Sequence, residues 1–127
     1  MEQLTFLPVM DKEMERKVQK EVISILKEYR ALKARFENEV EQMQEGISLF
    51  PEIRNTRHVS NIKFKQIDKA LQYVLDYDEA EIIKRKYLNA DKPKDSFIYT
   101  ELSMKKDHFY YKKKNAIRLI ATSLGMI

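Results

Sequence analysis

The sequence predicts an all-α protein in which a long N-terminal helix precedes a C-terminal helical domain that ends in a helix-turn-helix. Three observations support this fold class. Gly (2) and Pro (3) are scarce among the 127 residues. Lys, Glu, Leu, Ile, Gln and Met fill just over half of the positions, and most of these side chains lose little freedom in a helix. Apolar residues recur at steps of three and four, and no stretch shows the alternation of a strand.

The first predicted helix runs from an N-cap at Asp11 to Gly46. Its apolar positions form one stripe: Met14, Val18, Val22, Ile25, Leu26, Tyr29, Leu32, Phe36, Val40 and Met43. A helix with one apolar face is stable when that face is covered. The stripe would serve equally against the C-terminal helices of the same chain or against a second copy, so a homodimer through this helix stays an open alternative.

The helical pattern lapses between Gly46 and Ser60, around Pro51, and this lapse predicts a loop. The chain therefore divides into a helical arm (1–46), a linker (47–60) and a C-terminal domain (61–127). A second helix is expected from Ser60 or Asn61, with its apolar side inward: Ile62, Ile67, Leu71, Val74 and Leu75.

A third helix is expected to start at a capping-box-like pair, Asp78 and Glu81, and to run to about Leu88. Capping explains the acidic side chains at this helix start without a metal or acid/base role. Residues 89–94, which contain Pro93, end the helix.

The last two helices predict a tight corner. Asp95 or Ser96 caps a short fourth helix that runs through Leu102, and a fifth runs from about Lys105 to Leu124. The three-residue connection between them suits two helices that cross at roughly 90–120°, as in a helix-turn-helix. The corner and the preceding helix supply the expected apolar contacts: Ile83, Tyr87, Ile98, Leu102 and Met104.

Positive charge is concentrated in that last helix. Residues 1–60 hold 10 basic and 11 acidic side chains, whereas residues 61–127 hold 14 and 9. Six of the basic residues fall between Lys105 and Arg118, with one acidic residue among them. A local excess of this kind favours a polyanionic partner over a role in general solubility.

The last helix has an apolar side (Phe109, Ala116, Ile117, Ile120, Leu124) and an opposite side that is basic, amide-bearing and aromatic (Asp107, His108, Tyr111, Lys114, Asn115, Arg118). A recognition helix contacts base edges near its N-terminus and phosphates through flanking Lys and Arg. The candidate base contacts are Lys106, Tyr110, Tyr111 and Lys114. The candidate phosphate contacts are Lys105, Lys112, Lys113 and Arg118.

Each of these assignments has a plainer alternative. A run of lysines is usually a solvated face. Tyr110 and Tyr111 could equally be packing residues. His108 is either a surface residue or a phosphate donor, and His58 is read as structurally neutral.

Several function classes are excluded by composition. With no Cys and two His in the chain, we expect no thiolate or other metal site and no cofactor. Nothing resembles an activated nucleophile or a paired-carboxylate cleft, so we expect no enzyme. No apolar run approaches the ~20 residues of a membrane span, and the N-terminus has no basic-then-apolar leader, so we expect a cytoplasmic protein.

Several segments resemble the ArpU family of phage transcriptional regulators, whose C-terminal part is similar to region four of bacterial sigma factors. They are EAEIIKRKYL (79–88), IYTELSM (98–104), YYKKKNAIRLIATSLGM (110–126), LPVMD (7–11) and ILKEYRALK (25–33). The resemblance implies a phage or prophage protein of Gram-positive bacteria that acts on late packaging and lysis genes or on autolysin expression. It also implies DNA contacts at Lys106, Asp107, Tyr110, Tyr111 and Lys114.

The chain departs from that pattern at two positions. Ser103 stands where such turns often have Gly, and Lys105 stands where a Ser or Thr cap is usual.

We therefore expect a sequence-specific regulator that binds double-stranded DNA, with host RNA polymerase as a candidate partner. Two alternatives remain: a small phage DNA-packaging subunit, and a helical adaptor that binds another protein and not DNA.

Overall fold

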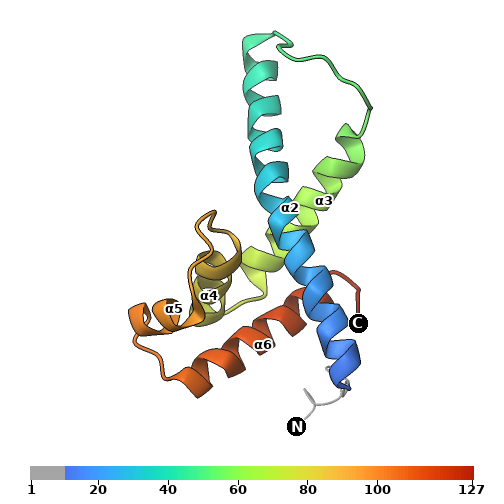
Figure 1. The fold of residues 1–127 in the computed structure, drawn as a ribbon. Helices are drawn as coiled ribbons and strands as arrows, with labels where there is room; N and C mark the ends of the chain where they lie inside the picture. Colours follow the sequence, from blue (N-terminus) through green and yellow to red (C-terminus); the bar gives the residue numbers. More distant parts are fainter. Residues whose placement is uncertain (1–10) are drawn as a thin grey trace.

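The computed structural model describes residues 11–127, and the five helices within this range confirm the all-α prediction (Figure 1). Their bounds are α2 Lys12–Glu45, α3 Arg57–Tyr73, α4 Tyr77–Tyr87, α5 Asp95–Glu101 and α6 Lys106–Ser123. The LPVM part of the family resemblance (7–10) lies outside the described residues.

Helix α2 begins and ends where the sequence predicts. The Asp11 side chain accepts a hydrogen bond from the backbone amide of Met14 at 2.8 Å, which caps the first turn. Gly46 ends the helix in the left-handed conformation (φ 69°), which glycine adopts without steric cost.

Three predicted helix starts are wrong by a few residues. Helix α3 starts at Arg57, not at Ser60 or Asn61. The capping box of α4 is formed by Asp76 and Glu79, not by Asp78 and Glu81: each side chain accepts a hydrogen bond from the other's backbone amide (2.8 and 2.9 Å).

The start of α5 was also misassigned, because the expected cap has another role. Its N-cap is Lys94, which makes no capping hydrogen bond through its side chain. The Asp95 carboxylate instead forms ion pairs with Lys86 (2.9 Å) and Lys113 (3.0 Å). Asp95 therefore forms ion pairs with residues of α4 and α6 in place of a capping hydrogen bond within α5.

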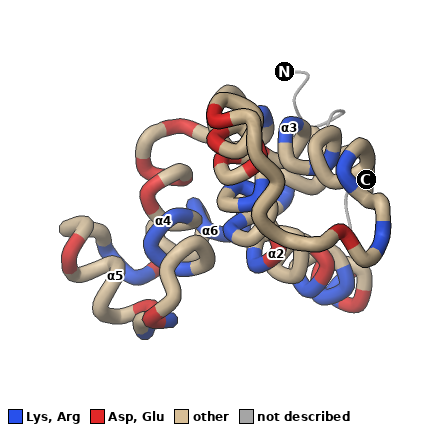
Figure 2. The backbone as a smooth tube through the Cα atoms, turned by 90° about the horizontal axis from the view of Figure 1, so that it is seen from above, with Lys and Arg blue, Asp and Glu red and all other residues tan. Residues whose placement is uncertain are grey.

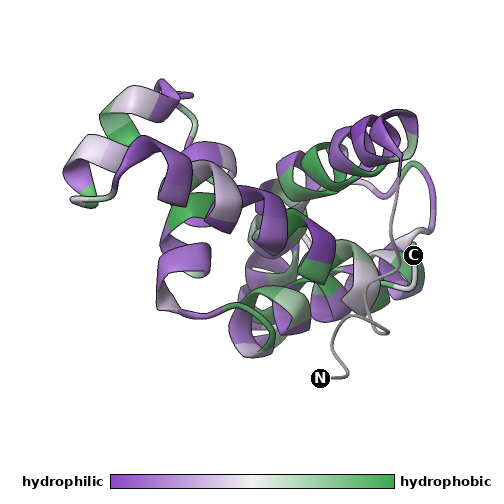
Figure 3. Ribbon diagram, turned by 90° about the horizontal axis from the view of Figure 1, so that it is seen from below, coloured by the Kyte–Doolittle hydropathy of each residue, from purple (hydrophilic) through white to green (hydrophobic). Residues whose placement is uncertain are grey.

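The first half of α2 lies across α4 and α6 and shares their core (Figure 1). The buried members of this core are Val18, Val22, Leu26, Ile83, Ala116, Ile117, Ile120 and Ala121. Hydrophobic and hydrophilic positions alternate along the helices (Figure 3), as expected of helices with one buried face. This part of the apolar stripe is therefore covered within the chain, and the core spans the predicted division between arm and C-terminal domain.

Helix α3 returns along the middle of α2 (Figure 1). Tyr29, Leu32 and Ile67 are buried between the two helices. The Phe64 ring stacks on Tyr29 and on Phe36, with ring centroids 5.7 and 5.1 Å apart. The Tyr29 hydroxyl donates a hydrogen bond to Asp68 at 2.7 Å, so this buried polar group is satisfied.

Beyond Phe36 the stripe on α2 is no longer covered. Val40 and Met43 are exposed, and so is Ile62 of α3, which was expected to point inward. We call residues 40–59, which comprise the end of α2, the connection to α3 and the start of α3, the hairpin tip.

The corner between α5 and α6 packs on α4. Ile82, Ile98 and Phe109 form its buried cluster, and Tyr99, Leu102 and Met104 pack against them. The expected contacts from α5 and the turn are confirmed. The contact from α4 is Ile82, because the expected Ile83 and Tyr87 face the core beneath α2.

Within residues 11–127, no helix combines the length and apolarity that a bilayer crossing requires.

Candidate nucleic-acid interface

The turn between α5 and α6 is held by backbone hydrogen bonds and lacks favourable capping residues. The amides of Ser103 and Met104 donate to the carbonyls of Thr100 (3.1 Å) and Tyr99 (2.8 Å). Ser103 adopts φ 56°, a left-handed conformation that costs a residue with a Cβ about 1 kcal/mol. Lys105 is the N-cap of α6 and makes no capping hydrogen bond through its side chain.

The start of α6 is exposed to solvent. Lys105, Lys106, Asp107, His108 and Tyr111 are all exposed. Among residues 11–127, no carboxylate forms an ion pair with either lysine. A positive charge at a helix N-terminus interacts unfavourably with the helix dipole, so these two lysines lower the stability of the helix start.

The middle of α6 is different, because its lysines are held by carboxylates of α4 and α5. Lys112 forms an ion pair with Asp76, and only 19% of its side chain is exposed. Lys113 forms one with Asp95, and 13% of its side chain is exposed. Burial acts to raise the pKa of Asp76, but hydrogen bonds from Lys112 and from backbone amides lower it overall. The same ion pair raises the pKa of Lys112.

A buried carboxylate joins α4 to α6. Glu79 is only 3% exposed. One of its oxygens completes the capping box, and the other accepts a hydrogen bond from the Asn115 side-chain amide at 2.6 Å. Asn115 is therefore a structural link between helices.

Tyr110 packs against the corner with one side of its ring and is 40% exposed. Its ring lies edge-on to Phe109, with centroids 5.3 Å apart, and the Lys113 ammonium lies 5.3 Å from the Tyr110 centroid. Desolvation and the nearby Asp95 carboxylate raise the pKa of Tyr110. These contacts favour the packing interpretation that the sequence left open.

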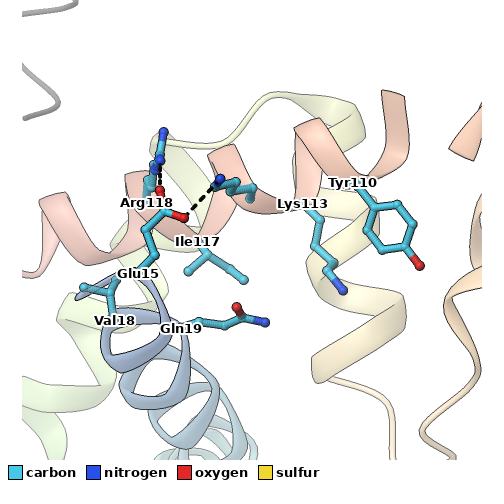
Figure 4. Close-up of a pocket in the computed structure, with 8 residues that line it drawn as sticks. Glu15, Val18, Gln19, Tyr110, Lys113, Ile117 and Arg118 are labelled. Carbon is cyan, nitrogen blue, oxygen red and sulfur yellow. Dashed lines mark hydrogen bonds and ion pairs between the residues drawn. The ribbon is translucent and has the colours of Figure 1, made fainter. Parts of the chain in front are cut away.

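The C-terminal part of α6 faces the first turn of α2. Glu15 forms ion pairs with Lys114 (3.0 Å) and with Arg118 (Figure 4). The hydrogen bond from Lys114 and, further, the contacts with Arg118 lower the pKa of Glu15. A cavity of about 380 Å³ beside this contact is lined by residues of both helices, among them Val18, Gln19 and Ile117.

The expectation that one whole side of α6 projects outward is therefore wrong for part of the helix. Lys112, Lys113, Asn115 and Arg118 are partly buried against other helices. In Figure 2 the basic positions of α6 lie alongside acidic positions of its neighbours. The positive surface that remains unneutralised is the start of the helix. Lys114 is paired but keeps 57% of its side chain exposed.

Many exposed cations outside α6 also lack an ion pair among the described residues, and Lys94 is the one that directly precedes α5. Lys94, the N-cap of α5, is exposed, and none of the described carboxylates forms an ion pair with it. Its position directly before a short helix and after Pro93 is the sequence signal that could have found it.

Neither histidine belongs to a cluster of metal-binding side chains. Within residues 11–127, no group of three or more His, Cys, Asp or Glu side chains could hold a metal ion. His58 and His108 are both exposed.

Comparison of the chain with models of protein families, with curated proteins and with solved structures gave no match.

Proposed function

We propose that this protein binds double-stranded DNA and regulates transcription, with the start of α6 entering the major groove. One observation carries the proposal: Lys105 and Lys106 are exposed and lack a carboxylate partner among the described residues, although the other basic side chains of α6 each have one. A helix start that is less stable with two lysines than without them is explained if phosphates supply the missing negative charge.

The arrangement of α4, α5 and α6 supports the same proposal. A seven-residue helix, a tight turn and an 18-residue helix pack on a third helix through Ile82, Ile98 and Phe109. A helix-turn-helix needs such a rigid corner, because its second helix must present N-terminal side chains to base edges. The sigma-region-four-like motif expected from the sequence has this order of helices.

The packing of α6 sharpens the roles of the candidate residues. Lys106 and Tyr111 are the proposed base contacts, and Asp107 is suited to accept a hydrogen bond from a cytosine amino group. Lys105, His108 and Lys94 are the proposed phosphate contacts. The paired residues Lys112, Lys113, Asn115 and Arg118 hold the helix in place, and Tyr110 supports it from the side.

The resemblance to ArpU regulators supports a narrower proposal about the target. The regulated genes would be late genes of a phage or prophage, in the cytoplasm of the bacterial host, with host RNA polymerase as the protein partner. The packaging-subunit and adaptor alternatives differ in assembly size and in DNA affinity, both of which are measurable.

The test is a titration of the full chain against duplex DNA at several salt concentrations. The double variant Lys105→Ala/Lys106→Ala should bind all duplexes at least tenfold more weakly. The slope of log K against log salt should become shallower by about 2, because roughly one unit is lost with each phosphate contact.

The matched control is Lys20→Ala/Lys27→Ala. Both lysines are exposed on α2, so the control removes the same net charge from a different surface. Equal losses in the two variants would mean that overall charge, and not the start of α6, governs binding. Negligible affinity of the unmodified chain at about 50 mM salt would favour the adaptor alternative.

A further inference from the structure

The hairpin tip gathers exposed apolar side chains at one end of the molecule (Figure 1). Met43 is 76% exposed, Phe50 73% and Ile53 89%. The other exposed apolar residues of the tip are Val40, Ile47, Leu49 and Val59. Single exposed apolar residues are ordinary, but a group of this size marks an interaction surface.

Polar contacts hold the connecting segment in place while its apolar side chains face outward. The Leu49 amide donates to the Gln42 side-chain oxygen at 3.2 Å. The Arg35 guanidinium donates to the hydroxyls of Thr56 (3.0 Å) and Ser60 (2.9 Å), which ties the end of the segment to α2. The tip is thus a defined surface whose apolar side chains are exposed by between 38% (Val40) and 89% (Ile53) within residues 11–127.

The same surface has a hollow beside its projections. A groove of about 960 Å³ runs between α2 and the connecting segment. Small side chains, Ala31 and Ala34, line it on α2, and Met43, Ile47 and Phe50 line it toward the tip. Most of the remaining lining is polar or charged: Arg35, Asn38, Glu39, Gln42, Ser48, Glu52 and Arg57. Ile53 does not line the groove and projects into solvent.

Charges around the tip are of both signs. Arg57 forms ion pairs with Glu39 (3.4 Å) and Glu52 (3.9 Å). The tip holds three glutamates (Glu41, Glu45, Glu52) and two arginines (Arg54, Arg57). A net charge of −1 repels a copy of itself only weakly and does not attract a polyanion.

We propose that the hairpin tip is covered by the hairpin tip of a second copy, in a two-fold symmetric homodimer. Each Ile53 would enter the groove of the other chain, since a two-fold interface pairs a projection and a hollow of the same surface with each other. The tip comprises the 20 residues from 40 to 59, the lower end of the roughly 20–30 residues that each partner contributes to a standard interface.

This dimer differs from one formed along the whole stripe of α2. The stripe from Val18 to Leu32 packs within the chain. This leaves its two ends, the single residue Met14 (49% exposed) and the larger group at the tip. The proposal stands independently of DNA binding, because the tip lies apart from the start of α6 (Figure 1).

The experiment is sedimentation velocity of the full chain without DNA. At about 50 μM, above the micromolar Kd expected of a modest interface, the mass should be twice the 15.2 kDa of one chain. The Ile53→Glu variant should sediment as a monomer, with Kd raised at least about 100-fold, because the new carboxylate would lose its water in a groove where Arg57 is already paired with Glu39 and Glu52. Its circular dichroism should stay unchanged, since Ile53 is exposed in the single chain.

The matched control is Tyr73→Ser, which removes an equally exposed side chain at the far end of α3 and should leave the dimer intact. The proposal is overturned if the unmodified chain is a monomer, if Ile53→Glu still dimerises, or if Tyr73→Ser disrupts the dimer as strongly. A ring-sized assembly would also overturn it and would favour a packaging subunit. DNA binding that fails without loss of the dimer would count against the proposed function alone.

Discussion

The two halves of α2 have the same spacing of apolar residues but differ in how far those residues are buried. In the first half, Val22 and Leu26 are completely buried beneath α4 and α6, whereas Met43 near the other end is mostly exposed. The step of three and four residues shows that a face must be covered, but it does not identify the cover. The first half is covered by its own chain, and the second half ends at a surface that we assign to another copy.

Helix α6 shows a similar difference between its two parts, in the pairing of its charged side chains. Its middle lysines are neutralised by carboxylates that arrive from α2, α4 and α5, while those at its start are not. The exposed apolar residues at the end of α2 and the lysines at the start of α6, unpaired within residues 11–127, are therefore the best candidates for contacts with a partner.

The largest effect expected from this contrast concerns burial. Leu26→Ala should lower the free energy of unfolding by about 2–5 kcal/mol, because it removes buried methyl groups and leaves a cavity. Met43→Ala at the tip should change it by less than about 0.5 kcal/mol in dilute solution. Urea titrations followed by circular dichroism would measure both. Similar losses would show that the tip is covered within the chain.

A smaller effect is expected from the buried carboxylate of α4. Glu79→Ala should destabilise the protein by about 1–3 kcal/mol, because it leaves the Asn115 amide without its acceptor and breaks the capping box. Asp78→Ala is the matched control, since Asp78 is an exposed acidic residue of the same first turn. If both variants lose equally little in thermal unfolding, the link between α4 and α6 is not a source of stability.

The smallest expected effect is an increase in stability that comes with a loss of DNA binding. Lys105→Ser should raise the stability by about 1 kcal/mol, because serine caps a helix start at which lysine offers no acceptor. The same change should weaken binding to duplex DNA. Chemical unfolding and a gel-shift titration of one preparation test both parts, and a variant that loses stability would remove the argument that Lys105 is retained for binding.

Local chemistry made several features predictable. The bounds of α2 follow from a capping Asp and a terminal Gly, and the corner cluster follows from apolar spacing around a three-residue turn. The left-handed conformation of Ser103 explains why glycine is expected there. The start of α6 was identified as basic from sequence alone, and it is the part of the predicted interface that stays exposed.

Other features could not be predicted, because they depend on residues far apart in the chain. Nothing local distinguishes Asp76 from Asp78 as a cap. The choice of Asp76 agrees with its ion pair to Lys112, 36 residues away. Likewise, Asp95 resembles an ordinary helix cap until Lys86 and Lys113 approach it.

By itself, the sequence determined which stretches are helical and where positive charge is concentrated, since both follow from neighbours within one or two helical turns. Only the tertiary structure decided which of those charges are neutralised and which apolar positions are covered. Ion pairing and burial depend on what lies opposite a side chain in space, and here the opposite residue, such as Glu15 facing Arg118, is up to 103 positions away.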